Sequence, residues 1–431
     1  MDEAALEFED AVERWVTRGE SRALSTWARR ELDIDGIPRS LPVAAWPSVL
    51  QKLASLQSLR RRAWPLVLWK RLHAFAESTA FARRHDGFPV FGTAESAACV
   101  SKALRSWNLE LGRADRDDFA GRLQEAGFER APVGAKSLDS WASRRVPVAF
   151  LRDSSPNARA TAALDQRDGS LPAWFELHAQ GSRILGTTWR SSLVAPAGTT
   201  MNVPSTEDGE ARPSVVKCGS EADLYEWRYS RGAARITRTL LLIKEFGLGL
   251  AAEEVDRVPN GTVASIEWAI PDAVNPRLVP ERRAVSLGVG RSQRAAMLVP
   301  LGLPSLPYPS DLGKFEVAAD TTMRCERVAR LTQRVEGKRV WMPIAICWDR
   351  GRNSKPTHWR RLTVTENMKV CRPDVAFAAR LSWGTDASLF VYRSLARPAL
   401  RAALGHQTKA RFVVGWFGSD GKVEPIVTID D

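Results

Sequence analysis

One short segment carries residue types that can bind a sugar or move a proton. Trp174, Glu176 and His178 occupy alternate positions of a segment with strand character, so they share one face, and the residues between them are apolar. An indole ring beside a carboxylate and an imidazole suits carbohydrate recognition or proton transfer. The same alternation fits solvent-facing or intersheet residues of an ordinary strand. Glu176 and His178 are therefore catalytic candidates, and Trp174 is a ligand-binding candidate.

A second segment places three aromatic residues on one face. Tyr225, Trp227 and Tyr229 alternate with Leu224, Glu226 and Arg228, which line the opposite face. The three rings fit an aromatic platform for a glycan, and they equally fit a cross-strand aromatic ladder in a core. All three are ligand-binding candidates, and Tyr225 is also a catalytic candidate.

The next segment has the strongest strand pattern in the chain. Residues 234–242 alternate one row of Arg235, Thr237 and Thr239 with another of Ile236, Arg238 and Leu240. One of these rows is expected to face water. Arg238 is included among the ligand-binding candidates.

Several other kinds of site have no sequence support. The five histidines form no HxH or HxxxH pair, and the five cysteines form no CxxC pair, so no metal site is predicted. The segment Gly288–Gly290 lacks the third glycine of a dinucleotide fingerprint, and no GxSxG nucleophile elbow is present. The sequence therefore predicts no cofactor.

The elements that carry these residues change in type along the chain. Residues 1–130 show helical periodicity, as in the apolar positions of residues 46–56 and 64–75. Residues 131–171 are rich in proline, glycine and polar residues, which indicates linker and loops. Short alternating or β-branched segments then fill residues 172–431, which we expect to form two sheet layers with a boundary near residues 301–312.

These patterns predict an α+β fold: a short N-terminal helical region followed by a large antiparallel β-sandwich region of supersandwich type. A parallel sheet is disfavoured because helical crossovers are missing between the strands.

Composition bears on partners and compartment. The formal net charge of +12 fits an acidic polysaccharide or a protein partner and leaves nucleic acid open, although the arginines are dispersed along the chain. The acidic N-terminus lacks a secretory signal, charge breaks every apolar stretch before membrane-spanning length, and the cysteine pattern fits a reducing compartment. We expect a soluble, cytoplasmic protein without a membrane span.

Part of the β region resembles the heparinase II/III-like family of polysaccharide lyases. Residues 174–186 are similar to the family's apolar strand followed by "x-G-x-x-L-L". Residues 222–227, 235–242 and 250–256 are similar to its strands "R-x-x-R, apolar run, then V-D". Further segments, at 359–364, 391–395 and 421–427, are similar to those of bacterial proteins with such a β domain.

The resemblance implies a β-sandwich domain that, in lyases of the family, follows a helical toroid supplying the tyrosine and histidine for β-elimination. Here no tyrosine precedes Tyr225, and residues 171–173 stand where the family has H-x-D. Elimination needs a base near the uronate α-proton and a group that neutralises its carboxylate. We therefore expect a non-catalytic heparinase-like β-sandwich protein that binds carbohydrate or a protein partner. A polysaccharide lyase acting on uronic-acid glycans is the alternative, and a basic polyanion or nucleic-acid binder is the second alternative.

Overall fold

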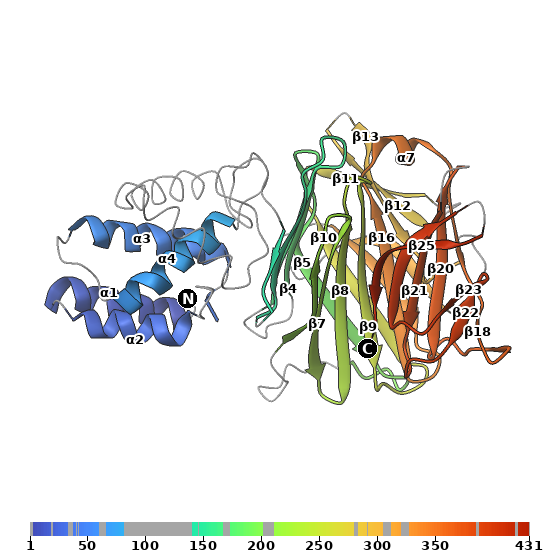
Figure 1. Ribbon diagram of the computed structural model, residues 1–431, viewed down its shortest axis with the longest axis horizontal. Coiled ribbons are helices and arrows are strands. Elements are labelled where there is room, and N and C mark those ends of the chain that lie inside the picture. The colour runs from blue at the N-terminus through green and yellow to red at the C-terminus, as the bar shows by residue number, and fades with distance from the viewer. Residues whose placement is uncertain are drawn as a thin grey trace. The chain divides into compact units, whose positions relative to one another are not determined.

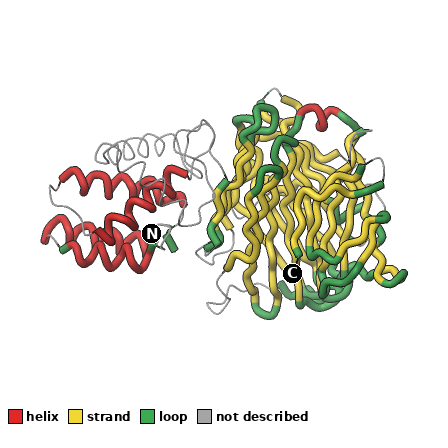
Figure 2. Tube along the Cα trace, in the orientation of Figure 1, coloured by secondary structure: helices red, strands yellow, loops and turns green. Residues whose placement is uncertain are grey.

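Strands dominate the described part of the protein, with helices confined mainly to its N-terminal portion (Figure 2). The computed structural model describes residues 3–18, 20–32, 38–39, 41, 43–59, 66–81, 140–144, 146–166, 173–200, 211–279, 283–290, 292–304, 312–319, 327–384, 388–418 and 421–430. The chain forms two compact units, Met1–Trp141 and Ala142–Asp431, called the helical unit and the β unit below.

The helical unit contains amphipathic helices whose apolar faces meet. Phe8 packs on Trp27 with ring centroids 4.7 Å apart, and Trp46 packs on Phe75 at 5.9 Å. The described elements are α1 (Glu3–Arg18), α2 (Ser21–Glu31), the 3₁₀ turn η1 (Val43–Ala45), α3 (Trp46–Leu59) and α4 (Leu66–Phe81). The predicted helical character of this region is confirmed as far as residue 81, and residues 82–139 lie outside the described part.

The β unit is a stack of four antiparallel sheets (Figure 1). The first sheet has the order β1 (Trp141–Ala142), β2 (Val148–Asp153), β3 (Ala160–Asp165), β4 (Ala173–Ala179), β5 (Ser182–Val194), β10 (Val263–Ile270), β15 (Arg327–Arg334), β14 (Gly313–Ala319). The second has the order β11 (Val274–Val279), β12 (Ala284–Val289), β13 (Ser292–Pro300), β16 (Arg339–Cys347), β9 (Leu248–Asp256), β8 (Ala234–Ile243), β7 (Ala222–Arg231), β6 (Arg212–Cys218).

The third and fourth sheets are smaller. The third has the order β17 (Thr357–Arg361), β20 (Ala376–Trp383), β21 (Ser388–Ser394), β24 (Phe412–Phe417), β25 (Val423–Ile429). The fourth has the order β19 (Lys369–Val370), β18 (Val364–Glu366), β22 (Arg401–Ala403), β23 (His406–Thr408). A five-residue helix, α7 (Arg350–Ser354), connects β16 to β17.

Three apolar cores hold the stack together. Trp189 and Trp227 belong to the core between the first and second sheets, and Trp341 and Phe412 to the core between the second and third. Phe390 belongs to a smaller core between the third and fourth sheets. The predicted α+β class with a large antiparallel β-sandwich region is confirmed.

The second sheet lies in the interior of the stack, which overturns one expectation. Both rows of β8 are buried, apart from partial exposure at Arg235, although one row was expected to face water. The reason is that the first sheet covers one face of the second sheet and the third sheet covers the other. One alternating row of β8 therefore faces the first sheet and the other row faces the third, so neither row faces solvent.

Two expected boundaries also differ from the structure. Residues 131–171, expected as linker and loops, contribute the paired strands β2 and β3, whose residues are all buried and therefore show no alternation. Near residues 301–312 the chain only passes from β13 in the second sheet to β14 in the first. The change to the third sheet comes later, between Cys347 and Thr357, and the described strands form four sheets where two layers were expected.

No helix in the part of the chain that the structure describes is long and apolar enough to cross a membrane.

Candidate functional site

The outer face of β4 presents the predicted row of three side chains. Trp174, Glu176 and His178 point away from the core, whereas the apolar residues between them belong to it. Trp174 is 37% exposed, while Glu176 and His178 are buried. The structure therefore confirms the shared face that alternation predicted.

Glu176 and His178 form an ion pair when the imidazole is protonated. The His178 Nε2 atom lies 3.2 Å from Oε1 of Glu176. A carboxylate in this position orients the imidazole, which can then accept a proton from a bound molecule or donate one to it. Because 11% of the His178 side chain is exposed, a ligand can reach the imidazole more readily than the carboxylate.

Arg183, which the sequence analysis did not select, completes this surface, and Gly186 makes room for it. The turn at Gln180 and Gly181, where both φ angles are positive, joins β4 to β5 and brings Arg183 opposite His178. Gly186 lies opposite Glu176 with φ +152°, and a Cβ there would lie only 3.1 Å from Cβ of Glu176 and 3.4 Å from Cδ of Arg183. The glycine thus allows the Arg183 chain to pass close to Glu176.

Arg183 differs from other arginines on the same sheet face. Arg190 and Arg330 both pair with Glu267, at 3.3 Å and 2.5 Å. Arg183 is exposed and has no ion pair with any described residue. We call Trp174, Glu176, His178 and Arg183 the β4 surface: an aromatic ring, a carboxylate–imidazole pair and an available cation.

Tyr225 lies apart from the β4 surface. Its side chain is fully buried between the first and second sheets, whereas Glu176 and His178 lie on the opposite face of the first sheet. The hydroxyl donates to the carbonyl oxygens of Val146 at 3.0 Å and Ser143 at 3.2 Å. Burial raises the pKa of Tyr225 well above 10.0, so this phenol stays protonated at neutral pH. The structure does not unite the three catalytic candidates.

The remaining ligand-binding candidates meet each other inside the same core. The Arg238 guanidinium lies over the rings of Trp189, at 5.2 Å, and Tyr229, at 5.1 Å. Trp227 donates through Nε1 to Oε1 of Gln166 at 2.6 Å, and Arg238 donates to the same oxygen at 2.9 Å. The alternation pattern therefore selected residues that lie close together in this core.

The Arg238 guanidinium forms its hydrogen bonds with other buried residues of the protein. Arg238 donates to Glu253 at 3.0 Å and to the Ser191 hydroxyl at 2.7 Å, and both Arg238 and Glu253 are fully buried. Burial also raises the pKa of Tyr229 to about 12. In this arrangement Tyr225, Trp227, Tyr229 and Arg238 join the first sheet to the second.

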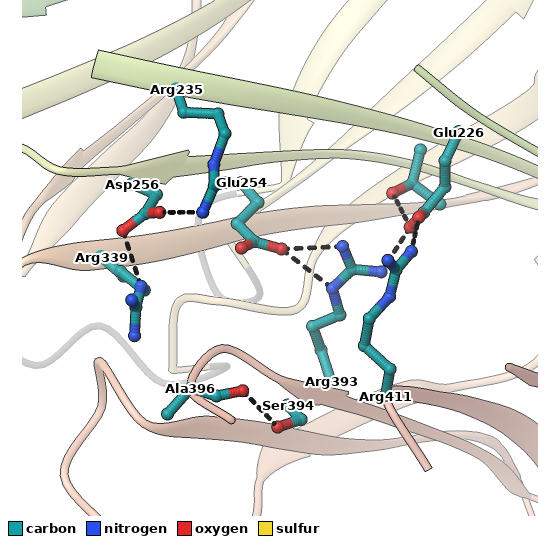
Figure 3. Close-up of polar contacts among 10 residues, drawn as sticks. Glu226, Arg235, Glu254, Asp256, Arg339, Arg393, Ser394, Ala396 and Arg411 are labelled. Atoms are coloured by element: carbon teal, nitrogen blue, oxygen red, sulfur yellow. Dashed lines mark hydrogen bonds and ion pairs between the residues drawn. The ribbon is translucent and has the colours of Figure 1, made fainter. Parts of the chain in front are cut away.

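A second buried charge network joins the second and third sheets (Figure 3). Arg393 on β21 donates to Glu254 at 3.0 Å and 2.7 Å, and it also donates to Glu226. Arg411 pairs with the other oxygen of Glu226, and Thr239 donates to that carboxylate at 2.9 Å. Burial alone would raise the pKa of Glu226, but the Arg393 and Arg411 charges hold it below its ordinary value.

The network continues at the ends of β8 and β16. Asp256 accepts from Arg235 at 2.6 Å and from Arg339 at 2.6 Å (Figure 3). Burial opposes ionisation of Asp256, but these two arginines lower its pKa. The carboxylates of β7 and β9 that face the third sheet are thus neutralised by arginines from several strands.

The fold is similar to that of a polysaccharide lyase of known structure. Heparan sulfate lyase HepC from Pedobacter heparinus matches with a TM-score of 0.58 and 11% sequence identity, over 91% of the present chain and 65% of the lyase. A mutant of that lyase matches with a TM-score of 0.58 and 12% identity, over 88% and 62% of the two chains. No protein-family model and no curated protein sequence matches the chain.

These matches concern the fold. The chain spans less than two thirds of the lyase chains, and 11–12% identity carries no residue roles from one protein to the other. The expected resemblance is supported at the level of a distant heparinase-like fold.

Proposed function

We propose that the β unit binds an acidic carbohydrate through the β4 surface and does not cleave it. The observation that carries the proposal is the grouping of exposed Trp174, the Glu176–His178 pair and Arg183 on one sheet face. An indole packs against the apolar face of a sugar ring, and a guanidinium binds a carboxylate or sulfate group. The heparinase-like fold is consistent with a carbohydrate ligand.

The tyrosines support binding without elimination. The described tyrosines are Tyr225, Tyr229 and Tyr392; all three are buried, and burial raises their pKa values. A phenol of this kind is a poor proton acceptor at neutral pH and is sealed from substrate. Tyr308 lies outside the described residues.

A lyase is the second candidate, and one observation favours it. The 3.2 Å contact between Glu176 and His178 is the geometry in which a carboxylate orients a histidine base. In that mechanism His178 would remove the α-proton of a uronate while Arg183 neutralises the uronate carboxylate. A C=C bond would form as the bond from the β-carbon to the glycosidic oxygen breaks, and the leaving oxygen would take a proton from water.

One set of measurements separates the two candidates. Heparan sulfate oligosaccharides are titrated into the protein by calorimetry, and the same mixtures are followed by ultraviolet absorbance for the unsaturated uronate that elimination creates. Binding without absorbance change is the expected result, and product that disappears in His178→Gln would establish the lyase.

Substitutions then locate the binding surface. Arg183→Gln is expected to weaken binding about tenfold, which corresponds to about 1.4 kcal/mol. Arg277→Gln makes the same charge change at an exposed position on β11 and serves as the matched control. Equal losses in both variants would indicate binding by overall positive charge, which is the behaviour expected of a general polyanion or nucleic-acid binder.

A further inference from the structure

A small pocket lies at one end of the interface between the second and third sheets. It has a cavity volume of about 30 Å³, and its lining includes Gln333, Glu336, Trp341, Arg361 and Phe377. Glu336 and Pro373 also line a larger open cleft of about 800 Å³, so the two spaces are adjacent. None of these residues belongs to the β4 surface.

Two residues that line the pocket each carry a buried polar atom without a hydrogen-bond partner among the described residues. Gln333 is 6% exposed and Trp341 is 2% exposed, yet the Gln333 Oε1 acceptor and the Trp341 Nε1 donor are both unsatisfied. Buried polar groups of this kind are normally paired, so the pocket lacks one donor and one acceptor. A ligand that offers a hydroxyl and an anionic oxygen would supply both.

Gly302 makes the position of the Gln333 amide possible. A Cβ at residue 302 would lie 2.6 Å from Nε2 and 2.8 Å from Oε1 of Gln333. The amide therefore packs directly on the glycine backbone, and a side chain there would displace it.

Arg361 supplies a positive charge that forms no direct ion pair with a described residue. It ends β17 on the same strand face as Trp359, which belongs to the core between the second and third sheets, and its guanidinium lies 5.7 Å from the Phe377 ring centroid. Burial lowers the pKa of Arg361, and the Glu336 charge acts in the opposite direction. Whereas Arg238 and Arg393 each bind a carboxylate, the Arg361 guanidinium has no ion pair or hydrogen bond with any described residue.

We propose that this pocket binds a small hydroxycarboxylate. The carboxylate accepts from Arg361 and from Trp341 Nε1, and a hydroxyl of the ligand donates to Oε1 of Gln333. The rest of the ligand extends into the cleft, where Arg257 and Lys338 add positive charge. Asp374 in the cleft is already neutralised by Arg372, at 2.6 Å.

This site is independent of glycan binding at the β4 surface, and its test needs no polysaccharide. Calorimetry of the full chain uses D-gluconate as the probe, with D-glucose supplying hydroxyls without charge and propionate supplying charge without hydroxyls. Gluconate is expected to bind at least about tenfold more tightly than either control compound. Absence of gluconate binding, or equal binding of propionate, would overturn the proposal.

Variants of the lining residues test the assignment. Arg361→Gln is expected to weaken gluconate binding about tenfold or more, whereas Arg360→Gln, on the opposite face of the same strand, leaves the affinity within about twofold. Gly302→Ala is expected to weaken binding by displacing the Gln333 amide.

Glu336→Gln keeps the test decisive if Arg361→Gln fails to fold. Glu336 is exposed and borders the pocket, so removal of its negative charge is expected to strengthen gluconate binding by a few-fold without loss of folding. An unchanged affinity in Glu336→Gln, or a loss in Arg360→Gln equal to that in Arg361→Gln, would contradict the assignment.

Discussion

Strands β4 and β7 have the same alternating pattern and different surroundings. In β4 one row packs into the core of the stack, and the other row faces away from that core, with Trp174 partly exposed and Glu176 and His178 buried. In β7 the aromatic row of Tyr225 faces the first sheet, and the row of Glu226 faces the third. Alternation thus divides a strand into two faces, but the layer that holds the strand decides whether either face meets solvent.

The comparison also separates two uses of charge. The carboxylates of β7 and β9 are paired inside the stack, while Arg183 beside β4 is exposed and has no ion pair with any described residue. Substitutions on β7 to β9 should therefore change stability, and substitutions on the β4 surface should change binding.

The largest expected effect is at Arg238. Arg238→Met leaves Glu253 as a buried charge without its partner, so we expect the free energy of unfolding to fall by about 3–5 kcal/mol. Chemical denaturation measures this change. Arg183→Gln is the control on the other surface and should alter stability by less than about 0.5 kcal/mol; similar losses in the two variants would remove the distinction.

The next largest effect is a loss of stability at acid pH, which depends on Glu226. The pKa of Glu226 in the folded protein lies below its ordinary value of 4.5, so its ionisation stabilises the folded state above that pH. This stabilisation is lost as pH falls through the lower folded pKa. Denaturation midpoints measured from pH 7 downward should therefore decline steeply in the acid range. The decline should be shallower in Glu226→Gln, which is less stable at neutral pH, and parallel curves would contradict the assignment.

A smaller effect is expected at Tyr225. Tyr225→Phe removes the hydrogen bonds to Val146 and Ser143 without creating a cavity, and should cost about 1–2 kcal/mol of stability. Affinity for heparan sulfate oligosaccharides should stay unchanged. A loss of affinity in a folded Tyr225→Phe protein would place this residue in the binding site.

The smallest expected effect is at Trp174. Because its ring is partly exposed, Trp174→Ala should weaken glycan binding by about fivefold to tenfold, or about 1–1.4 kcal/mol, with a change in stability below about 0.5 kcal/mol. Leu278→Ala on β11, which also removes an exposed apolar side chain, is the control. Equal affinity in wild type and Trp174→Ala would exclude the ring from binding.

Local pattern was sufficient for the fold class and for the row on β4, because the helices follow from helical periodicity and the strands from a two-residue period. The number of layers was not predictable from local pattern. A strand such as β8 shows the same alternation whether its sheet lies in the middle of a stack or on its outside. Strands β2 and β3 were missed because residues buried on both faces show no alternation.

Residues brought together by strand pairing were also beyond local pattern. Arg183 approaches His178 through a hairpin, and Gly181 beside Gln180 was a turn signal in the sequence that could have set that register. Gln333 and Arg361 meet at one pocket from different sheets, and no local spacing connects them.

Hydrogen exchange with and without bound heparan sulfate oligosaccharide tests the central claim most directly. The account predicts new protection in residues 173–186, which form β4, its turn and the start of β5, with little change in β21 and β24. Protection confined to the loops at residues 257–262, 335–338 and 371–375, with none at residues 173–186, would show that the glycan binds elsewhere and would contradict the proposal for the β4 surface.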